Sequence, residues 1–321
     1  MNFLDNTLRL GYGAMGLEGV YGKSDDKEAI ETLKYVIEKN MMIDTSDAYG
    51  NGHNEELIAK AIKQANKEAF VATKFGIVFE ENIESRIHDT GWGLPIPVNG
   101  SKAYVKHAIE QSLKRLDVEA LDLLYIHFVD PETPIEETVG AMSEAVKEGK
   151  VKSLGLSNPS VDEILRANKI HNISAVQYEY SLFNRNAENG ILSTTKDIGA
   201  KFVSWGPLGN GILSGNVNSL ENEDFRNNNP KFTGENFKTN LQKVETFKEL
   251  AKDLDLTPAQ LSLAWLLNKD ENIIPIPGSK KISRIEENLK ALDIKLDVNV
   301  INTIEELLPL GTFKGNPLIM K

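Results

Sequence analysis

The sequence predicts an α/β fold: a closed (β/α)8 TIM barrel, formed as a single domain over residues 1–321, with long loops at its C-terminal face. Short apolar segments alternate with amphipathic helical segments along the whole chain. Most apolar segments lack polar–apolar alternation, as is typical of strands covered on both faces. An open, doubly wound sheet is the alternative. The eight predicted strands are 8–12, 41–44, 70–74, 121–127, 151–156, 174–178, 201–205 and 273–277.

The helical segments carry recognisable start signals. Apolar residues recur on one helical face between 105 and 116. The first helix should begin near residues 24–26. Pro134 and Pro258 are expected at the first helical position, where a missing N–H costs nothing. Four capping boxes predict further helix starts, at Thr133, Ser160, Thr257 and Ser283.

Two long segments, 76–100 and 206–239, interrupt the alternation of predicted strands and helices. Loops longer than about 15 residues in a compact domain are usually functional or disordered. Both segments follow predicted strands, so in a barrel both lie on the face that carries active sites. The second segment is polar and rich in asparagine, and it either folds over a ligand or stays a disordered surface loop.

Composition excludes several classes of function. The 321 residues include no cysteine, which rules out disulfides, thiolate nucleophiles and cysteine-ligated metals. A net charge of −11 argues against nucleic acid or an anionic membrane as partner. No segment approaches the ~20 apolar residues of a membrane span, and no signal peptide is recognisable, so a cytoplasmic location is expected. No metal site is expected, because four histidines lack metal-ligand spacing: His53, His88, His107 and His171.

Two short motifs suggest dehydrogenases but have the wrong context. Residues 11–16 match GxGxxG, yet no helix is predicted to open at the third glycine, as a Rossmann fold requires. We interpret this run as a glycine-rich strand end that allows close approach of backbone or ligand. Tyr35 and Lys39 match YxxxK, but they lie in an early amphipathic helix and are interpreted as helix-face residues.

Four polar residues follow three successive predicted strands. Asp44 and Tyr49 come after the second strand, Lys74 ends the third, and His127 ends the fourth. Each alone has an ordinary explanation as a helix cap, a solvated lysine or a core histidine. In a barrel, however, all four meet at the C-terminal mouth. A nearby ammonium lowers the pKa of a tyrosine, which is ~10 when free, a carboxylate keeps the lysine charged, and a histidine can orient a carbonyl oxygen.

An ordered set of motifs extends this pattern over most of the chain and resembles the aldo-keto reductase superfamily. The resemblance is greatest to the bacterial and plant branch of pyridoxal-reductase-like and general aldehyde or ketone reductases. That branch also has the motif found here at 129–137, VDPETPIEE. The motifs are IDTSDAYG at 43–50, TKFG at 73–76, YIH at 125–127, GLSN at 155–158, Gln177, GPLG at 206–209 and IPGSK at 276–280.

The resemblance implies a barrel that binds NADPH/NADP+ without a Rossmann domain and reduces aldehydes or ketones by hydride transfer. It implies that Tyr49 is the general acid, that Lys74 lowers its pKa while paired with Asp44, and that His127 orients the carbonyl. Ser157, Asn158 and Gln177 match positions that hold the nicotinamide carboxamide. Trp205 departs from the family's tyrosine but keeps an aromatic face for the nicotinamide ring.

Three further sets of residues follow from the resemblance or from neighbouring sequence. The pyrophosphate loop corresponds to Gly206, Leu208, Gly209 and Gly211. The adenosine end, where cations grip a 2′-phosphate, corresponds to Gly278, Ser279, Lys280, Arg284, Glu287 and Asn288. The expected walls of the substrate pocket are Tyr21, Trp92 and Phe128.

The leading hypothesis is an NADPH-dependent oxidoreductase that acts on a small aldehyde or ketone. The alternative from another class is a nucleotide-binding regulatory subunit of the same fold, similar to the potassium-channel β subunits, with little turnover. The two differ in whether simple aldehydes oxidise the bound reduced nicotinamide. Neither the carbonyl substrate nor the oligomeric state is readable from the sequence.

Overall fold

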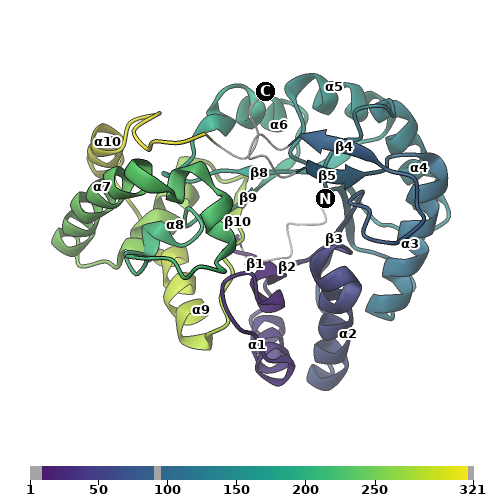
Figure 1. Ribbon diagram of the computed structural model, residues 1–321, viewed down its shortest axis with the longest axis horizontal. Helices are drawn as coiled ribbons and strands as arrows, with labels where there is room; N and C mark the ends of the chain where they lie inside the picture. The colour runs from purple at the N-terminus through teal and green to yellow at the C-terminus, as the bar shows by residue number, and fades with distance from the viewer. Residues whose placement is uncertain (1–8, 90–94, 317–321) are drawn as a thin grey trace.

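The computed structural model describes residues 9–89 and 95–316. Eight parallel strands surround the centre of the molecule in the order β1-β2-β3-β6-β7-β8-β9-β10 (Figure 1). Each overlaps a strand predicted from the sequence. Their bounds are β1 Tyr12–Gly13, β2 Ile43–Asp44, β3 Val71–Phe75, β6 Leu123–Ile126, β7 Leu154–Ser157, β8 Ile173–Glu179, β9 Lys201–Trp205 and β10 Ile273–Pro275.

Backbone hydrogen bonds join the last strand of this series to the first. The Gly11 N–H donates to the Pro275 carbonyl at 2.9 Å, and the Gly13 N–H donates to the Pro277 carbonyl at 3.4 Å. The predicted barrel is therefore confirmed, and the open sheet is excluded. The GxGxxG run continues into a 3-10 helix, Ala14–Glu18, rather than the α-helix that a dinucleotide fingerprint requires.

The helices form a ring outside the strands (Figure 1). The first begins at Asp26, capped by Asp25, in agreement with the predicted start. No helix in the described parts of the chain is long and apolar enough to cross a membrane. The helices are α1 Asp26–Glu38, α2 His53–Ala65, α3 Lys102–Leu116, α4 Ile135–Lys147, α5 Val161–Ile170, α6 Ile191–Asp197, α7 Gly234–Asp253, α8 Pro258–Lys269, α9 Ile282–Leu289 and α10 Val298–Leu307.

Two of the four predicted capping boxes are present, those of Ser160 and Thr257, and Pro258 occupies the expected first turn of α8. The other two predictions were wrong. Pro134 is itself the N-cap of α4, with no side-chain cap bond, and the Thr133 hydroxyl donates to Asp130 at 2.8 Å. The last predicted box lies one residue inside α9, whose N-cap is a lysine without a side-chain cap bond.

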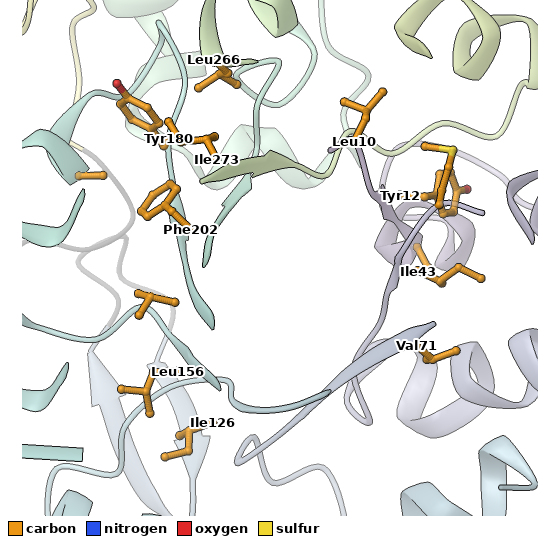
Figure 2. Packing of buried hydrophobic residues seen from close by; sticks show 14 of the residues in the cluster. Leu10, Tyr12, Ile43, Val71, Ile126, Leu156, Tyr180, Phe202, Leu266 and Ile273 are labelled. Atoms are coloured by element: carbon orange, nitrogen blue, oxygen red, sulfur yellow. The ribbon is translucent and has the colours of Figure 1, made fainter. Parts of the chain in front are cut away.

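Alternation along the strands separates two apolar layers. Outward-facing side chains pack against the helices, and Figure 2 shows Ile43, Ile126, Leu156 and Phe202 in this layer. A second, smaller cluster includes Ala72 and Tyr125. Lys74 and His127 follow these two residues by two positions, so alternation directs them to the same side, above the small cluster.

Both long segments contain structure that the sequence did not predict. The first holds an antiparallel hairpin, β4 Arg86–Asp89 with β5 Pro95–Val98. The second folds into short 3-10 turns between residues 212 and 232, and α7 begins at Gly234, before the predicted loop end at 239. Both follow barrel strands, β3 and β9, as predicted.

Candidate active site

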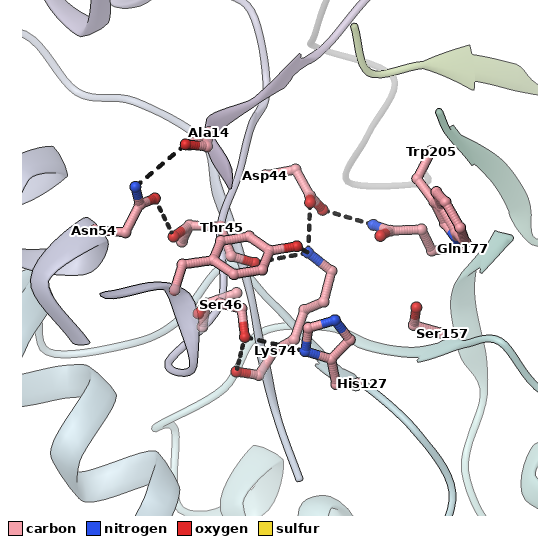
Figure 3. A network of polar contacts seen from close by, with 12 residues as sticks. Ala14, Asp44, Thr45, Ser46, Asn54, Lys74, His127, Ser157, Gln177 and Trp205 are labelled. Atoms are coloured by element: carbon pink, nitrogen blue, oxygen red, sulfur yellow. Dashed lines mark hydrogen bonds and ion pairs between the residues drawn. The ribbon is translucent and has the colours of Figure 1, made fainter. Parts of the chain in front are cut away.

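An ion pair between Asp44 and Lys74 lies at the centre of the barrel mouth (Figure 3). Lys74 Nζ is 2.5 Å from Asp44 Oδ1, and it also donates to the Thr45 carbonyl at 2.8 Å. Only 1% of Lys74 and 2% of Asp44 are exposed. Burial lowers the pKa of Lys74, but Asp44 and Tyr49 more than compensate, so the net shift is upward and the ammonium stays charged.

Tyr49 lies on a tight turn directly after β2, where Gly50 adopts a positive φ of 58°. Its hydroxyl oxygen is 3.4 Å from Lys74 Nζ. Lys74 lowers the pKa of Tyr49, as the sequence predicted, but burial outweighs this effect and the net pKa is above its usual value. The tyrosine therefore carries its proton at neutral pH, next to an ammonium that stabilises the phenolate once the proton leaves.

His127 follows β6 and faces Tyr49 edge-on, with ring centroids 5.9 Å apart. Its Nδ1 lies 3.1 Å from the Ser46 hydroxyl. Burial, helped by the nearby charge of Lys74, lowers its pKa well below the usual value, so the imidazole is neutral. A neutral imidazole carries one N–H donor, which suits it to bind an uncharged oxygen.

Polar side chains from β7, β8 and β9 complete the mouth. Gln177 Nε2 donates to Asp44 Oδ2 at 2.6 Å. Asn158 donates to the His127 carbonyl at 3.3 Å and accepts from the Trp205 indole N–H at 2.9 Å. The structure thus brings the four predicted catalytic residues together with the residues predicted to hold a carboxamide. The Tyr49 hydroxyl, the Lys74 ammonium that can stabilise its phenolate, and the neutral imidazole of His127 therefore lie in one site.

The sequence profile of the Aldo/keto reductase family matches residues 9–309, nearly the whole chain. The chain belongs to this family. Its members are oxidoreductases, so the family and enzyme class predicted from the motifs are confirmed.

Individual relatives agree with this assignment. A probable aldo-keto reductase 1 from Glycine max is 41% identical over 313 residues, which cover 96% of this chain and 87% of the relative. Aldo-keto reductase yakc (NADP(+)) from Schizosaccharomyces pombe is 38% identical over 311 residues, 94% of this chain and 88% of the relative. Among solved structures, a glycerol dehydrogenase from Gluconobacter oxydans superposes with a TM-score of 0.84 at 26% identity, covering 98% and 96% of the two chains.

In this aldo/keto reductase, three glycines in the loop after β9 adopt left-handed backbone conformations. Gly206, Gly209 and Gly211 have positive φ angles of 61°, 56° and 92°. A Cβ on Gly209 would come within 2.6 Å of the Phe183 side chain, so only glycine fits there without rearrangement. The predicted Leu208 packs half-buried against the core.

The predicted adenosine end adjoins the point where the barrel closes. Gly278 lies against β1, where an added Cβ would come within 2.6 Å of the Gly13 carbonyl oxygen. The Ser279 hydroxyl accepts the Lys281 N–H at 3.0 Å, a local turn bond. Along α9, Arg284 is exposed, Glu287 is half-buried and Asn288 is buried.

Lys280 differs from the sequence expectation of a cation available to a phosphate. Its Nζ donates to backbone carbonyls of residues 21, 22 and 23, at 3.3, 2.8 and 2.8 Å. These bonds fasten the loop after β1 to the loop after β10. Arg284, by contrast, is exposed.

The predicted substrate-pocket residues fall in different places. Phe128 stacks on His127 with ring centroids 5.2 Å apart and is buried. The Tyr21 hydroxyl donates to Asn210 at 3.3 Å, and Arg226 lies over the Tyr21 ring, so Tyr21 connects two loops at the mouth. Trp92 lies outside the described residues.

Sequence reasoning missed Ser46, and it gave no role to His53, which contacts Glu18 at 3.1 Å and Asp26 at 3.2 Å. A signal for Ser46 was available, because it follows Asp44 by two positions in extended chain and so shares its side of the backbone. Within the described residues, no three His, Cys, Asp or Glu side chains are placed to hold a metal ion.

Proposed function

We propose that the protein is an NADPH-dependent reductase of aldehyde or ketone carbonyls, with Tyr49 as general acid. The observation that carries the proposal is the buried chain from Asp44 through Lys74 to the Tyr49 hydroxyl, at 2.5 and 3.4 Å. The name of the yakc relative, which specifies NADP(+), supports the choice of nicotinamide.

The donor set at the mouth fits a nicotinamide. Gln177 uses one N–H on Asp44, which leaves its carbonyl oxygen for an amide donor, and the Ser157 hydroxyl lies nearby (Figure 3). Trp205 supplies an aromatic face, held in place by its bond to Asn158. The three positive-φ glycines after β9 form a compact turn at the position where the family resemblance places the pyrophosphate. NADPH bound here would supply the hydride for the reduction.

The protein's own residues then handle the carbonyl oxygen and the proton. The neutral His127 donates a hydrogen bond that positions the carbonyl oxygen. Tyr49 transfers its phenolic proton to that oxygen as the alcohol forms. Lys74, kept charged by Asp44, stabilises the resulting phenolate until it takes up a proton from solvent.

The decisive experiment compares the wild type with Tyr49→Phe. We expect NADPH oxidation in the presence of a panel of aldehydes and ketones, and a loss of about 10²–10⁴-fold in kcat for the variant. The Kd for NADPH should stay nearly the same. A fully active variant would remove the mechanism, whereas tight NADPH binding by the wild type without turnover of any carbonyl would favour the regulatory-subunit alternative.

We further propose a cytoplasmic location and a single domain over residues 1–321, on the basis of composition and family resemblance. The acidic net charge of −11 favours a small-molecule carbonyl as partner over nucleic acid or a membrane.

A further inference from the structure

Ser46 is fully buried, and its hydroxyl lies beside the His127 ring and the Lys74 carbonyl. It lies on extended chain that continues β2, fixed by backbone bonds on both sides. The Thr45 N–H donates to the Ala72 carbonyl at 2.8 Å, and the Asp47 N–H donates to the Lys74 carbonyl at 3.0 Å. The Ser46 hydroxyl therefore has a defined position rather than the freedom of a surface serine.

The hydrogen bonds around the Ser46 hydroxyl restrict where its single proton can go. Its oxygen accepts the Ala48 N–H at 3.2 Å. The three acceptors in reach are His127 Nδ1 at 3.1 Å, Asp47 Oδ1 at 3.2 Å and the Lys74 carbonyl at 3.5 Å. The Lys74 carbonyl is at the limit of a hydrogen bond and already accepts the Asp47 N–H.

Of the three acceptors, His127 Nδ1 is the nearest, and it belongs to another strand end, whereas Asp47 is the serine's own neighbour in sequence. Burial, reinforced by Glu55, raises the pKa of Asp47 well above its usual value. This shift disfavours the charged carboxylate, which is the form of Asp47 that competes best for the serine proton. The serine proton then goes to Nδ1 of His127, the nearest acceptor.

We propose that Ser46 donates to Nδ1 of His127 and thereby holds the neutral ring in the tautomer that carries its proton on Nε2. In Figure 3 the second ring nitrogen points away from Ser46, toward the space bordered by Lys74, Ser157 and Gln177. An N–H there donates to a carbonyl oxygen, whereas the other tautomer presents a lone pair to that oxygen and repels it. Ser46 is thus a positioning residue that acts through His127, and its consequence for turnover rests on the proposed function.

The tautomer can be measured directly on the wild-type protein. Two-bond ¹H–¹⁵N correlations of the imidazole rings separate protonated from unprotonated ring nitrogens, and His127→Gln assigns the signal among the five histidines. We expect a protonated Nε2 and an unprotonated Nδ1 at neutral pH. A protonated Nδ1 in the wild type overturns the proposal.

The Ser46→Ala variant removes the donor with little change of volume. We expect its His127 signals to move toward a mixture of tautomers and its kcat to fall by about ten- to a hundredfold, with a smaller change in KM. Ser46→Thr keeps the hydroxyl and should restore the wild-type tautomer. An unchanged tautomer in Ser46→Ala overturns the proposal.

A matched control is the adjacent Thr45→Val. Thr45 is also fully buried, but its hydroxyl donates to Asn54 at 2.7 Å and does not contact His127. We expect it to destabilise the fold while the His127 tautomer stays the same, and a tautomer shift of the size seen in Ser46→Ala would contradict the assignment to Ser46.

These measurements separate the inference from the proposed function. The tautomer is read without substrate, so a protein that turns over no carbonyl but shows the Ser46-dependent Nε2–H tautomer contradicts only the proposed function. If Ser46→Ala fails to fold, the wild-type spectrum still decides the question.

Discussion

Gln177 donates to Asp44 across the mouth of the barrel, with Nε2 2.6 Å from Oδ2. The two residues come from β8 and β2, which are not neighbours in the sheet. Lys74 binds the other carboxylate oxygen of Asp44, so both oxygens are occupied. A residue proposed to hold the cofactor's carboxamide is therefore connected through Asp44 and Lys74 to the proposed general acid, Tyr49.

The variant Gln177→Met tests whether Gln177 affects the Lys74–Tyr49 pair through Asp44. Loss of the amide leaves one Asp44 oxygen buried without its donor, which costs about 1–3 kcal/mol of stability and weakens the charge that holds Lys74. We expect a lower urea midpoint and a fall of about tenfold or more in kcat with simple aldehydes. The control, Gln242→Met on the exposed side of α7, should change stability by no more than about 0.5 kcal/mol. Equal kcat values in Gln177→Met and the wild type would contradict the coupling.

The sequence predicted the strands and the four mouth residues because both leave local signals. Strands covered on both faces are continuously apolar, and a polar residue such as Lys74 or His127 at a strand end stands out. The bond between Gln177 and Asp44 leaves no such signal, since it depends on which strands face each other after closure. The hairpin in segment 76–100 left no such signal either. The role of Thr133 was missed although its cause is local, since its hydroxyl donates to Asp130, three residues earlier in the chain.

Lys280 and Arg284 should differ in their effect on cofactor choice. The Lys280 ammonium is bound to three backbone carbonyls, whereas Arg284 is exposed. Arg284→Ala should therefore raise the Kd for NADPH about ten- to a hundredfold and leave that for NADH nearly unchanged, as expected for a lost charged bond to a 2′-phosphate. Lys280→Met should loosen the loop after β1 and weaken both nucleotides alike. Fluorescence titration checks both, and a selective NADPH defect in Lys280→Met would show that the lysine does bind the phosphate.

Gly278 should not tolerate a side chain, even a methyl group. A Cβ there would come within 2.6 Å of the Gly13 carbonyl oxygen. Relieving this clash requires a backbone shift in β1 or in the segment after β10, where hydrogen bonds close the barrel. We expect Gly278→Ala to lower the free energy of unfolding by about 1–3 kcal/mol, as overpacking does. The same change at Gly140, inside α4 with nothing within 4 Å of the added Cβ, should stabilise the protein by about 0.5–1 kcal/mol. Urea unfolding of the two variants should therefore give shifts of opposite sign, and shifts of the same sign would contradict this account of the closure.

His127 should contribute a pH dependence to stability. Burial and Lys74 hold its pKa well below 6.5 in the folded protein, whereas the unfolded chain takes up the proton near pH 6.5. Below that pH the unfolded state binds more protons, so the free energy of unfolding falls as the pH falls, by at most about 1.4 kcal/mol per pH unit. In His127→Gln, the free energy of unfolding measured with urea should therefore fall less steeply between about pH 6.5 and 5 than in the wild type. Subtracting the two curves isolates His127, because Asp47 and other buried groups titrate in both proteins, and parallel curves would contradict a neutral buried imidazole.

Arg226 should control how long a cofactor stays bound, because it fastens the segment after β9 to the loop after β1. Its guanidinium lies 5.4 Å from the centre of the Tyr21 ring and donates to the Asn210 carbonyl at 3.0 Å. The Tyr21 hydroxyl, whose pKa is raised to about 12 mainly by burial, remains protonated and donates to the Asn210 side chain. These contacts hold the glycine turn proposed for the pyrophosphate against the loop after β1.

Arg226→Met keeps much of the side chain's length but removes the cation over the ring and the bond to Asn210, together worth about 1–2 kcal/mol. If the segment must open before NADPH leaves, that loss raises its dissociation rate about tenfold, measured by stopped-flow displacement with excess NADP+. Arg166→Met is the matched control, since Arg166 pairs with Glu136 and Asp162 on the outer helices α4 and α5. We expect that variant to release NADPH at the wild-type rate. Equal rates for Arg226→Met and Arg166→Met would mean that release does not require the contacts between Arg226, Tyr21 and Asn210 to break.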